Sequence, residues 1–224
     1  MLIDLHNHTW PRSHDSVLDP GDLIERARVA GLDGVCMTEH DTVWNEAEAR
    51  ALAEKHGFLV IPGVEISTDD GHILAFGVEK YVFGMHRAHR LAEHVNERGG
   101  CLVAAHPYRR QMAWRDDPQE WRKSLRRAAE NPAYVHCIAL EVLNGRGNDR
   151  ENRFSQELRD LMGLPGTGGT DSHAVHDIGT VATSFASDRI ETWRDLVREL
   201  KAGRFCAVDM ATGKEYAVPV RAGD

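Results

Sequence analysis

Cysteines are few in this sequence, and no motif groups them. The four cysteines stand far apart and none belongs to a CxxC pair, so neither a thiolate zinc finger nor a disulfide framework is expected. Three of them lie in apolar segments, which predicts reduced thiols in the core of a cytoplasmic protein. The four are Cys36, Cys101, Cys137 and Cys206.

Long apolar runs and an excess of basic residues are missing as well. No run approaches the length of a membrane span, and Asp4 interrupts the apolar start, so neither a membrane segment nor a signal peptide is expected. The net charge of -8 makes binding to long nucleic acid a poor expectation. No GxSxG elbow and no Walker-type glycine loop occurs, which excludes two common catalytic designs.

Helix-like and strand-like segments alternate along the whole chain, which predicts an α/β fold with a mainly parallel sheet. Apolar residues make up 42% of the 224 residues, enough for one large domain over 1–224. A basic, aromatic insertion at about 107–118 is the one irregular stretch. Strands are expected at 2–6, 34–40, 58–65, 72–79, 101–107, 137–144, 180–186 and 204–208, with a short strand and a loop over 164–173, and helices at 19–31, 45–57, 86–100, 117–130, 149–162 and 190–203.

Histidines and carboxylates gather where the predicted strands meet the loops that follow them. The carboxyl ends of strands in barrel-like α/β folds converge on one face, so six segments direct these residues to one place. His72 is the exception, because it stands at the start of its strand. All are residue types that bind divalent metals. The residues are His6, His8, His40, Glu65, His72, His106, Asp171 and His173.

The opening segment MLIDLHNHTW contributes two of these histidines and an aspartate at alternating positions. Asp4, His6 and His8 alternate along an extended segment, so their side chains share one side of it. In a closed barrel this side would face inward. The pattern predicts His6 and His8 as metal ligands and Asp4 as a deeper hydrogen-bond partner.

Read in order, DLHNHT, TEHD, IPGVEIS, HILAFGV, AHP and GTDSH resemble the motifs of the PHP (polymerase and histidinol phosphatase) domain family. The resemblance extends from Met1 to about Phe205. It implies a distorted (β/α)7 TIM-like barrel of the PHP type, with up to three metal ions at the C-terminal ends of the strands. Catalytic members of the family often stand alone, and nothing here resembles the DNA polymerases to which other members are attached.

The resemblance implies which residues hold the first two metals. The first would be bound by His6, His8, Glu65 and Asp171, and the second by Glu65, His72 and His106, with the Glu65 carboxylate bridging the two.

The third metal would be held by His40, His173 and one residue of RSHDS. Asp15 matches family members that read S-x-D-S, whereas His14 suits members with a histidine six residues after the HxH. We favour Asp15 and keep His14 as the alternative. Glu39, where many members have Asp, points away from His40 by strand parity, so little effect on ligation is expected.

Two or three clustered divalent ions (Zn²⁺, Mn²⁺ or Fe²⁺) suit the hydrolysis of a phosphate ester. The hypothesis is that a hydroxide held between the first two metals attacks phosphorus in line, which makes Glu65 and Asp171 the central residues of the reaction. His176, three residues after His173, is a candidate for protonating the leaving group; a surface histidine is the plainer interpretation.

Candidate substrate-binding residues follow two strand ends. Arg109, Arg110 and Tyr108 lie in the insertion after His106, and Arg146 follows a later strand. Arginine forks match phosphate geometry, and tyrosine stacks on bases. A solvated basic loop explains each arginine equally well.

The predicted function is a metal-dependent phosphoesterase that hydrolyses a phosphate monoester or diester of a small metabolite or nucleotide. The competing hypotheses are a non-catalytic, metal-stabilised regulatory module and an amidohydrolase-type hydrolase, which also opens with HxH on a strand. A monomer without membrane contact is expected.

Overall fold

The computed structural model describes residues 1–115 and 117–217, so Asp116 of the predicted insertion and residues 218–224 of the predicted domain lie outside the described residues. The strands are β1 (Leu2–Asp4), β2 (Gly34–Met37), β3 (Leu59–Pro62), β4 (Val64–Thr68), β5 (Gly71–Phe76), β6 (Cys101–Ala104), β7 (Ala139–Asn144), β8 (Gly166–Gly169), β9 (Val181–Phe185), β10 (Phe205–Asp209) and β11 (Lys214–Tyr216). The helices are α1 (Pro20–Val29), α2 (Glu46–His56), α3 (Ala88–Glu97), α4 (Pro118–Ala129), α5 (Asp149–Met162) and α6 (Trp193–Ala202), with a 3₁₀ turn η1 at Tyr134–His136.

The predicted helices all form, and local sequence explains their ends. The Asp19 side chain caps α1 by accepting from Gly21 N, and Asn45 opens α2 with a capping box. Gly57 and Gly163 end α2 and α5 in the left-handed conformation. The predicted order of elements is therefore confirmed, apart from η1 and β11, which were not predicted, and one predicted strand that is divided into β3 and β4.

The strands form two sheets, with orders β11-β10-β9-β1-β2-β3 and β4-β5-β6-β7-β8. Parallel pairing joins β1 to β2 and β2 to β3 in one sheet, and β6 to β7 and β7 to β8 in the other. The other pairs are antiparallel, including β4 with β5 and β5 with β6. The prediction of one mainly parallel sheet is therefore wrong: the described strands form two sheets, parallel pairing is limited to two runs of three strands, and the fold is mixed α/β.

The segment predicted as one strand over 58–65 is two strands in different sheets, so that prediction is wrong. The break falls at Gly63, between β3 and β4. A Cβ at Gly63 would lie 2.9 Å from the Phe76 ring, so only glycine allows the chain to pass this close.

Backbone hydrogen bonds connect the two sheets at the ends of the strands. Beyond β1, His8 N donates to Ser172 O (3.0 Å) and Asp171 N donates to His6 O (2.8 Å). Beyond β2, Glu65 N donates to Glu39 O (3.0 Å), next to an isolated bridge between His40 and Glu65. These contacts bring segments with predicted metal ligands side by side.

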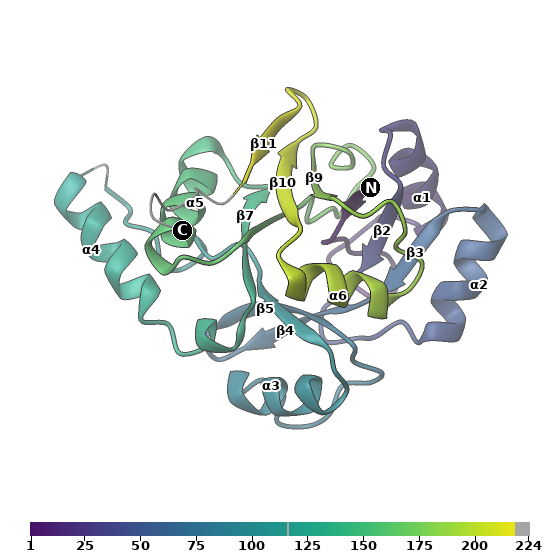
Figure 1. Cartoon of the computed structure of the whole chain (residues 1–224), viewed down its shortest axis with the longest axis horizontal. Coiled ribbons are helices and arrows are strands. Elements are labelled where there is room, and N and C mark those ends of the chain that lie inside the picture. Colours follow the sequence, from purple (N-terminus) through teal and green to yellow (C-terminus); the bar gives the residue numbers. More distant parts are fainter. Residues whose placement is uncertain (116, 218–224) are drawn as a thin grey trace.

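Helices flank the strands on several sides: α1 and α2 lie beside β2 and β3, α4 and α5 lie on the opposite flank, and α3 lies beyond β4 and β5 (Figure 1). Cys36, Cys101 and Cys137 are buried free thiols, as expected, whereas Cys206 is half-buried. Among the described residues, no helix combines the length and apolar character needed to cross a membrane.

Candidate metal centre

The nine residues predicted as metal ligands meet at one place in the structure. They come from the segments after β1, β2, β6 and β8, from β4, and from the start of β5. Each contributes a nitrogen or carboxylate oxygen to a connected cluster made of His6, His8, Asp15, His40, Glu65, His72, His106, Asp171 and His173. The prediction that six segments converge on one face is thus met by the geometry.

Glu65, on β4, lies at the centre of the cluster and is fully buried. Its Oε1 is 2.9 Å from His106 Nε2 and 2.9 Å from His72 Nδ1. Its Oε2 is 2.9 Å from His40 Nδ1 and 3.3 Å from His8 Nε2. Each carboxylate oxygen therefore faces a different set of histidines, which is the arrangement a bridging carboxylate needs.

The electrostatics of Glu65 favour its charged form. Burial by itself raises the pKa of the Glu65 carboxyl, but the charge of His6 and the hydrogen bonds from His106 and His40 hold the pKa well below its usual range. The Glu65 carboxylate is therefore ionised near neutral pH and available to a cation.

Four buried residues form what we call the inner group: His6, His8, Glu65 and Asp171. The Nε2 atoms of His6 and His8 are 3.0 Å apart. Asp171 Oδ1 lies 3.6 Å from His6 Nε2 and 3.4 Å from His8 Nε2. Asp171 is a non-glycine residue with a φ of 58°, a left-handed conformation that costs about 1–3 kcal/mol and that the surroundings must hold in place.

The position of His72 follows from the direction of β5. This strand runs antiparallel to β4 and β6, so its first residues lie at the end of the fold where the parallel strands finish. His72 thus reaches Glu65 from the start of a strand. The exception in the sequence pattern is explained by the reversal of one strand.

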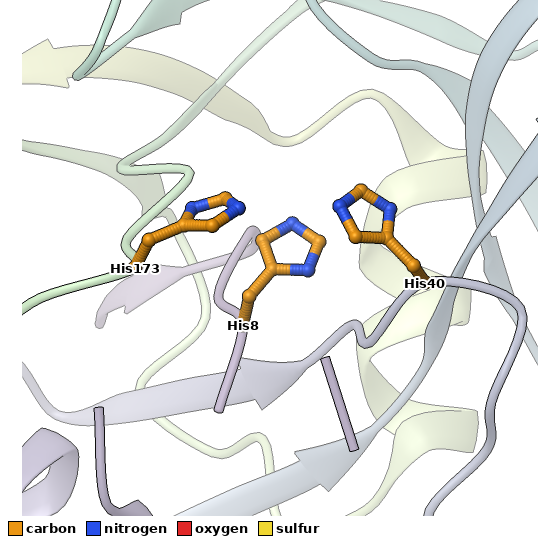
Figure 2. Close-up of side chains that lie close together, drawn as sticks. All are labelled: His8, His40 and His173. Atoms are coloured by element: carbon orange, nitrogen blue, oxygen red, sulfur yellow. The ribbon is translucent and has the colours of Figure 1, made fainter. Parts of the chain in front are cut away.

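His40, His173 and Asp15 form the outer group. Asp15 Oδ2 is 3.2 Å from His40 Nε2 and 3.1 Å from His173 Nε2. Figure 2 shows the rings of His40 and His173 on either side of His8, all three leaning toward one space. His14, the alternative ligand, is exposed and lies against the Trp10 ring with 6.2 Å between ring centroids.

The donor set fits divalent metal ions. Asp171 Oδ1 is buried and accepts no hydrogen bond from the described residues, although three histidine rings surround it. Histidine nitrogens and carboxylate oxygens without thiolates suit Zn²⁺, Mn²⁺ or Fe²⁺. The residues present therefore match the ions that the sequence implied.

The Nδ1 atoms of His173 and His8 have hydrogen-bond partners that are not ligand atoms of the cluster, which leaves the Nε2 atoms of both rings facing the cluster. His173 Nδ1 is 2.9 Å from the carbonyl oxygen of Asp171, so Nδ1 donates and carries the proton. His8 Nδ1 is 3.2 Å from Ser13 Oγ, which in turn donates to Glu39 (2.6 Å). Glu39 points away from His40 as predicted, but through Ser13 it supports His8, a role the sequence reading missed.

Two buried carboxylates, those of Asp4 and Glu141, hold His6 in place. Asp4 Oδ1 accepts from His6 N (3.2 Å) and Thr170 N (2.9 Å), so Asp4 is the predicted hydrogen-bond partner, although it holds backbone and not a ring. Burial raises the pKa of Asp4 to about 6. The ring of His6 is held instead by Glu141, which the sequence reading missed; a charged residue inside the apolar strand CIALEVLN was the available signal.

Arg109 is the predicted substrate residue that touches the cluster. Its guanidinium donates to Asp171 Oδ2 (2.5 Å) and lies 3.0 Å from His106 Nε2. A cavity of about 190 Å³ opens beside it, with Arg109, Arg110, His72 and His106 in its lining. A ligand in this cavity would contact both cluster histidines and arginines.

The other predicted residues lie farther from the cluster or are buried. Tyr108 is only 6% exposed, and its hydroxyl donates to Asn144 (3.4 Å). Arg146 is exposed, and its backbone N donates to Asn144. The His176 side chain is 86% exposed and pairs with Asp177 at 3.3 Å, and no described contact joins it to the cluster.

Comparison with known families agrees with the motifs. The family model of the PHP domain matches residues 4–143, and that of the PHP-associated region matches residues 149–205. This chain belongs to the PHP family.

Two relatives illustrate the family. The protein MJ1587 of Methanocaldococcus jannaschii is 30% identical over 117 residues, which cover 48% of this chain and 68% of that protein. The 3′,5′-nucleoside bisphosphate phosphatase of Chromobacterium violaceum is 36% identical over 81 residues, which cover 34% of this chain and only 28% of that enzyme. The prediction of a PHP-family phosphoester hydrolase is confirmed at the level of the family.

Solved structures share the fold. PsfC from Pseudomonas syringae PB-5123 has a TM-score of 0.64 at 21% identity, covering 95% of this chain and 92% of its own. A protein of Bifidobacterium adolescentis that carries the name metal-dependent phosphoesterase has a TM-score of 0.56 at 20% identity, covering 90% of this chain and 96% of its own. At these identities the likeness shows the fold alone.

Proposed function

We propose that this protein hydrolyses a phosphate monoester or diester of a small metabolite or nucleotide, using two to three divalent ions. The observation that carries the proposal is Glu65, whose two carboxylate oxygens face separate sets of histidines at 2.9–3.3 Å. When bound, such ions supply Lewis-acid stabilisation of a phosphoryl group and an activated water. His6, His8, Glu65 and Asp171 would hold the first ion, Glu65, His72 and His106 the second, and Asp15, His40 and His173 the third.

The residues of the chain provide the rest of the site. Arg109 lies between the cluster and the cavity, where its guanidinium is placed to bind phosphoryl oxygens. Arg110 lines the same cavity and is proposed to bind a more distant part of the substrate. Arg146 and Tyr108 remain predicted substrate residues, and His176 remains the predicted proton donor to the leaving group.

We also propose that the two sheets act as one distorted (β/α)7 barrel. The strands β1, β2, β4, β5, β6, β7 and β8 follow one another around the site by pairing or by bridges at their ends, and the bridge between Asn7 and Ser172 returns to β1. This order supports a closed ring at the end that holds the ligands. A cytoplasmic, monomeric protein remains the prediction from the sequence.

The test is elemental analysis of purified protein beside hydrolysis of an aryl phosphate, nucleoside mono- and bisphosphates and a cyclic phosphodiester, with and without Mn²⁺. Two to three ions per chain, with turnover that Glu65→Gln removes, are expected. Glu199→Gln is the matched control, because Glu199, on α6, is also buried but pairs with Arg204. Bound metal without turnover on any ester would favour the non-catalytic module.

A further inference from the structure

Glu141 is a buried carboxylate outside the predicted ligand set, and both of its oxygens are engaged. It lies on β7 and is 1% exposed. Its Oε1 is 2.9 Å from His6 Nδ1, while its Oε2 accepts from His106 N (2.8 Å) and from Asn144 Nδ2 (2.9 Å). Glu141 thus connects ligands from two different strands.

An irregularity in β7 brings Glu141 and Asn144 to the same side. The register against β8 shifts between Glu141 and Leu143, as a β-bulge does. In a regular strand, residues three positions apart face opposite sides, whereas one extra residue re-aims the side chains beyond it. The bulge therefore allows the Asn144 amide to reach Glu141.

Asn144 extends the connection to Asp171. Its Nδ2 lies 3.3 Å from Asp171 Oδ2 as well as 2.9 Å from Glu141, and its Oδ1 accepts from the Tyr108 hydroxyl at 3.4 Å. With Oδ2 held by Asn144 and Arg109, Asp171 Oδ1 is left facing the histidine nitrogens. One amide thus orients a carboxylate that faces the cluster.

The neighbouring strand leaves room for this arrangement. A Cβ at Gly169 of β8 would lie 2.6 Å from Glu141 Oε1 and 2.5 Å from His6 Cβ. No other residue type fits there without displacing one of the two. The glycine-rich sequence GTGG therefore accommodates the pair of His6 and Glu141.

We propose that Glu141 is a positioning residue for the inner group. It holds the proton of His6 on Nδ1, so that the Nε2 lone pair faces the cluster, and through Asn144 it fixes the orientation of Asp171. The inference builds on the proposed metal site but not on the reaction. Partners of this kind, behind a metal ligand, typically change metal affinity about 10- to 100-fold.

The experiment is a Co²⁺ titration of the metal-free full chain, followed by the visible absorption of bound Co²⁺. Glu141→Gln is expected to weaken the binding of the Co²⁺ ion at the inner group about 10- to 100-fold and to alter the absorption spectrum of that ion. The affinity and the spectrum of the Co²⁺ ion at the outer group should be unchanged. The control Glu199→Gln removes a buried carboxylate far from the cluster and should leave the whole titration unchanged.

A second readout reports the ring itself. Nitrogen NMR of ¹⁵N-histidine-labelled metal-free protein, recorded at a pH high enough to make the His6 ring neutral, should show His6 protonated at Nδ1 in the wild type and mixed between Nδ1 and Nε2 in Glu141→Gln. If that variant does not fold, Asn144→Ala replaces it, with a several-fold loss of Co²⁺ affinity expected. Wild-type affinity and a wild-type His6 tautomer in a folded variant would overturn the proposal. If Co²⁺ binding changes as expected but the metal-loaded wild-type protein hydrolyses no phosphoester, the role of Glu141 is supported and the proposed function is wrong.

Discussion

The inner and outer groups differ sharply in their exposure to solvent. His6, His8, Glu65 and Asp171 have side chains that are 0–1% exposed, whereas Asp15 in the outer group is 55% exposed. Charges in the inner group have lost their hydration and depend on one another or on a cation. The outer group retains water as a competitor, so its ion should bind more weakly and exchange faster. The comparison predicts unequal metal affinities across a single cluster.

The largest expected effect comes from removing Glu65, the inner-group carboxylate that is proposed to hold both the first and the second ion. Glu65→Gln should lower kcat at least about 10²–10³-fold, the loss typical of a dominant electrostatic group. It should also reduce metal content by more than one ion, because Glu65 faces two sets of histidines. Steady-state kinetics and elemental analysis check both. A variant that keeps its metal and its turnover would remove the bridging role.

Removing the metals should destabilise the inner group in particular. An ion present at 100 times its Kd stabilises the fold by about 2.7 kcal/mol, which corresponds to roughly 5–10 °C in Tm for a chain of this size. Thermal unfolding with and without a chelator, and after reloading with Mn²⁺, measures the difference. An unchanged Tm in protein shown to have lost its metal would mean that the buried carboxylates are balanced by histidines alone.

Replacing Arg109, which contacts the cluster and lines the cavity, tests whether this side chain binds substrate. A hydrogen bond to a charged group contributes about 1.5–3 kcal/mol, so Arg109→Ala should raise KM for phosphorylated substrates roughly 10- to 100-fold. Arg50→Ala is the matched control, because the Arg50 side chain is 74% exposed and pairs with Glu54 on α2, away from the residues that line the cavity. Equal KM values for wild type and Arg109→Ala would leave Arg109 as a partner of Asp171 only.

The smallest effect is expected at the exposed end of the outer group. Asp15→Asn should weaken one metal equivalent about 10-fold, near the lower end of effects at a metal site, while the inner equivalents stay tight. His14→Asn should change nothing, since His14 lies against Trp10 and away from His40. Isothermal titration with Mn²⁺ distinguishes the two. A loss in His14→Asn with none in Asp15→Asn would reverse the assignment of the third ligand.

Much of the site was predictable because most of its ligands lie directly after strands, a local property of the sequence, although Glu65 lies within β4 and His72 at the start of β5. The reversal of β5 was predictable too: only six residues separate Glu65 from His72, and a parallel connection needs a dozen or more. The break at Gly63 was not, since it depends on the distant Phe76 ring. Glu141 was missed because its partners, His6 and His106, meet only in the folded chain.

The hairpin of β4 and β5 contributes part of the lining of the cavity beside the cluster. Its turn at Asp69 and Asp70 is anchored on both sides, since Asp69 N donates to His86 O (2.8 Å) and Asn131 Nδ2 donates to Asp70 O (2.8 Å). Gly71, directly after the turn, lines the cavity beside His72. Gly71 and His72 directly follow this anchored turn, so a change in its length would alter the lining of the cavity while every metal ligand is kept.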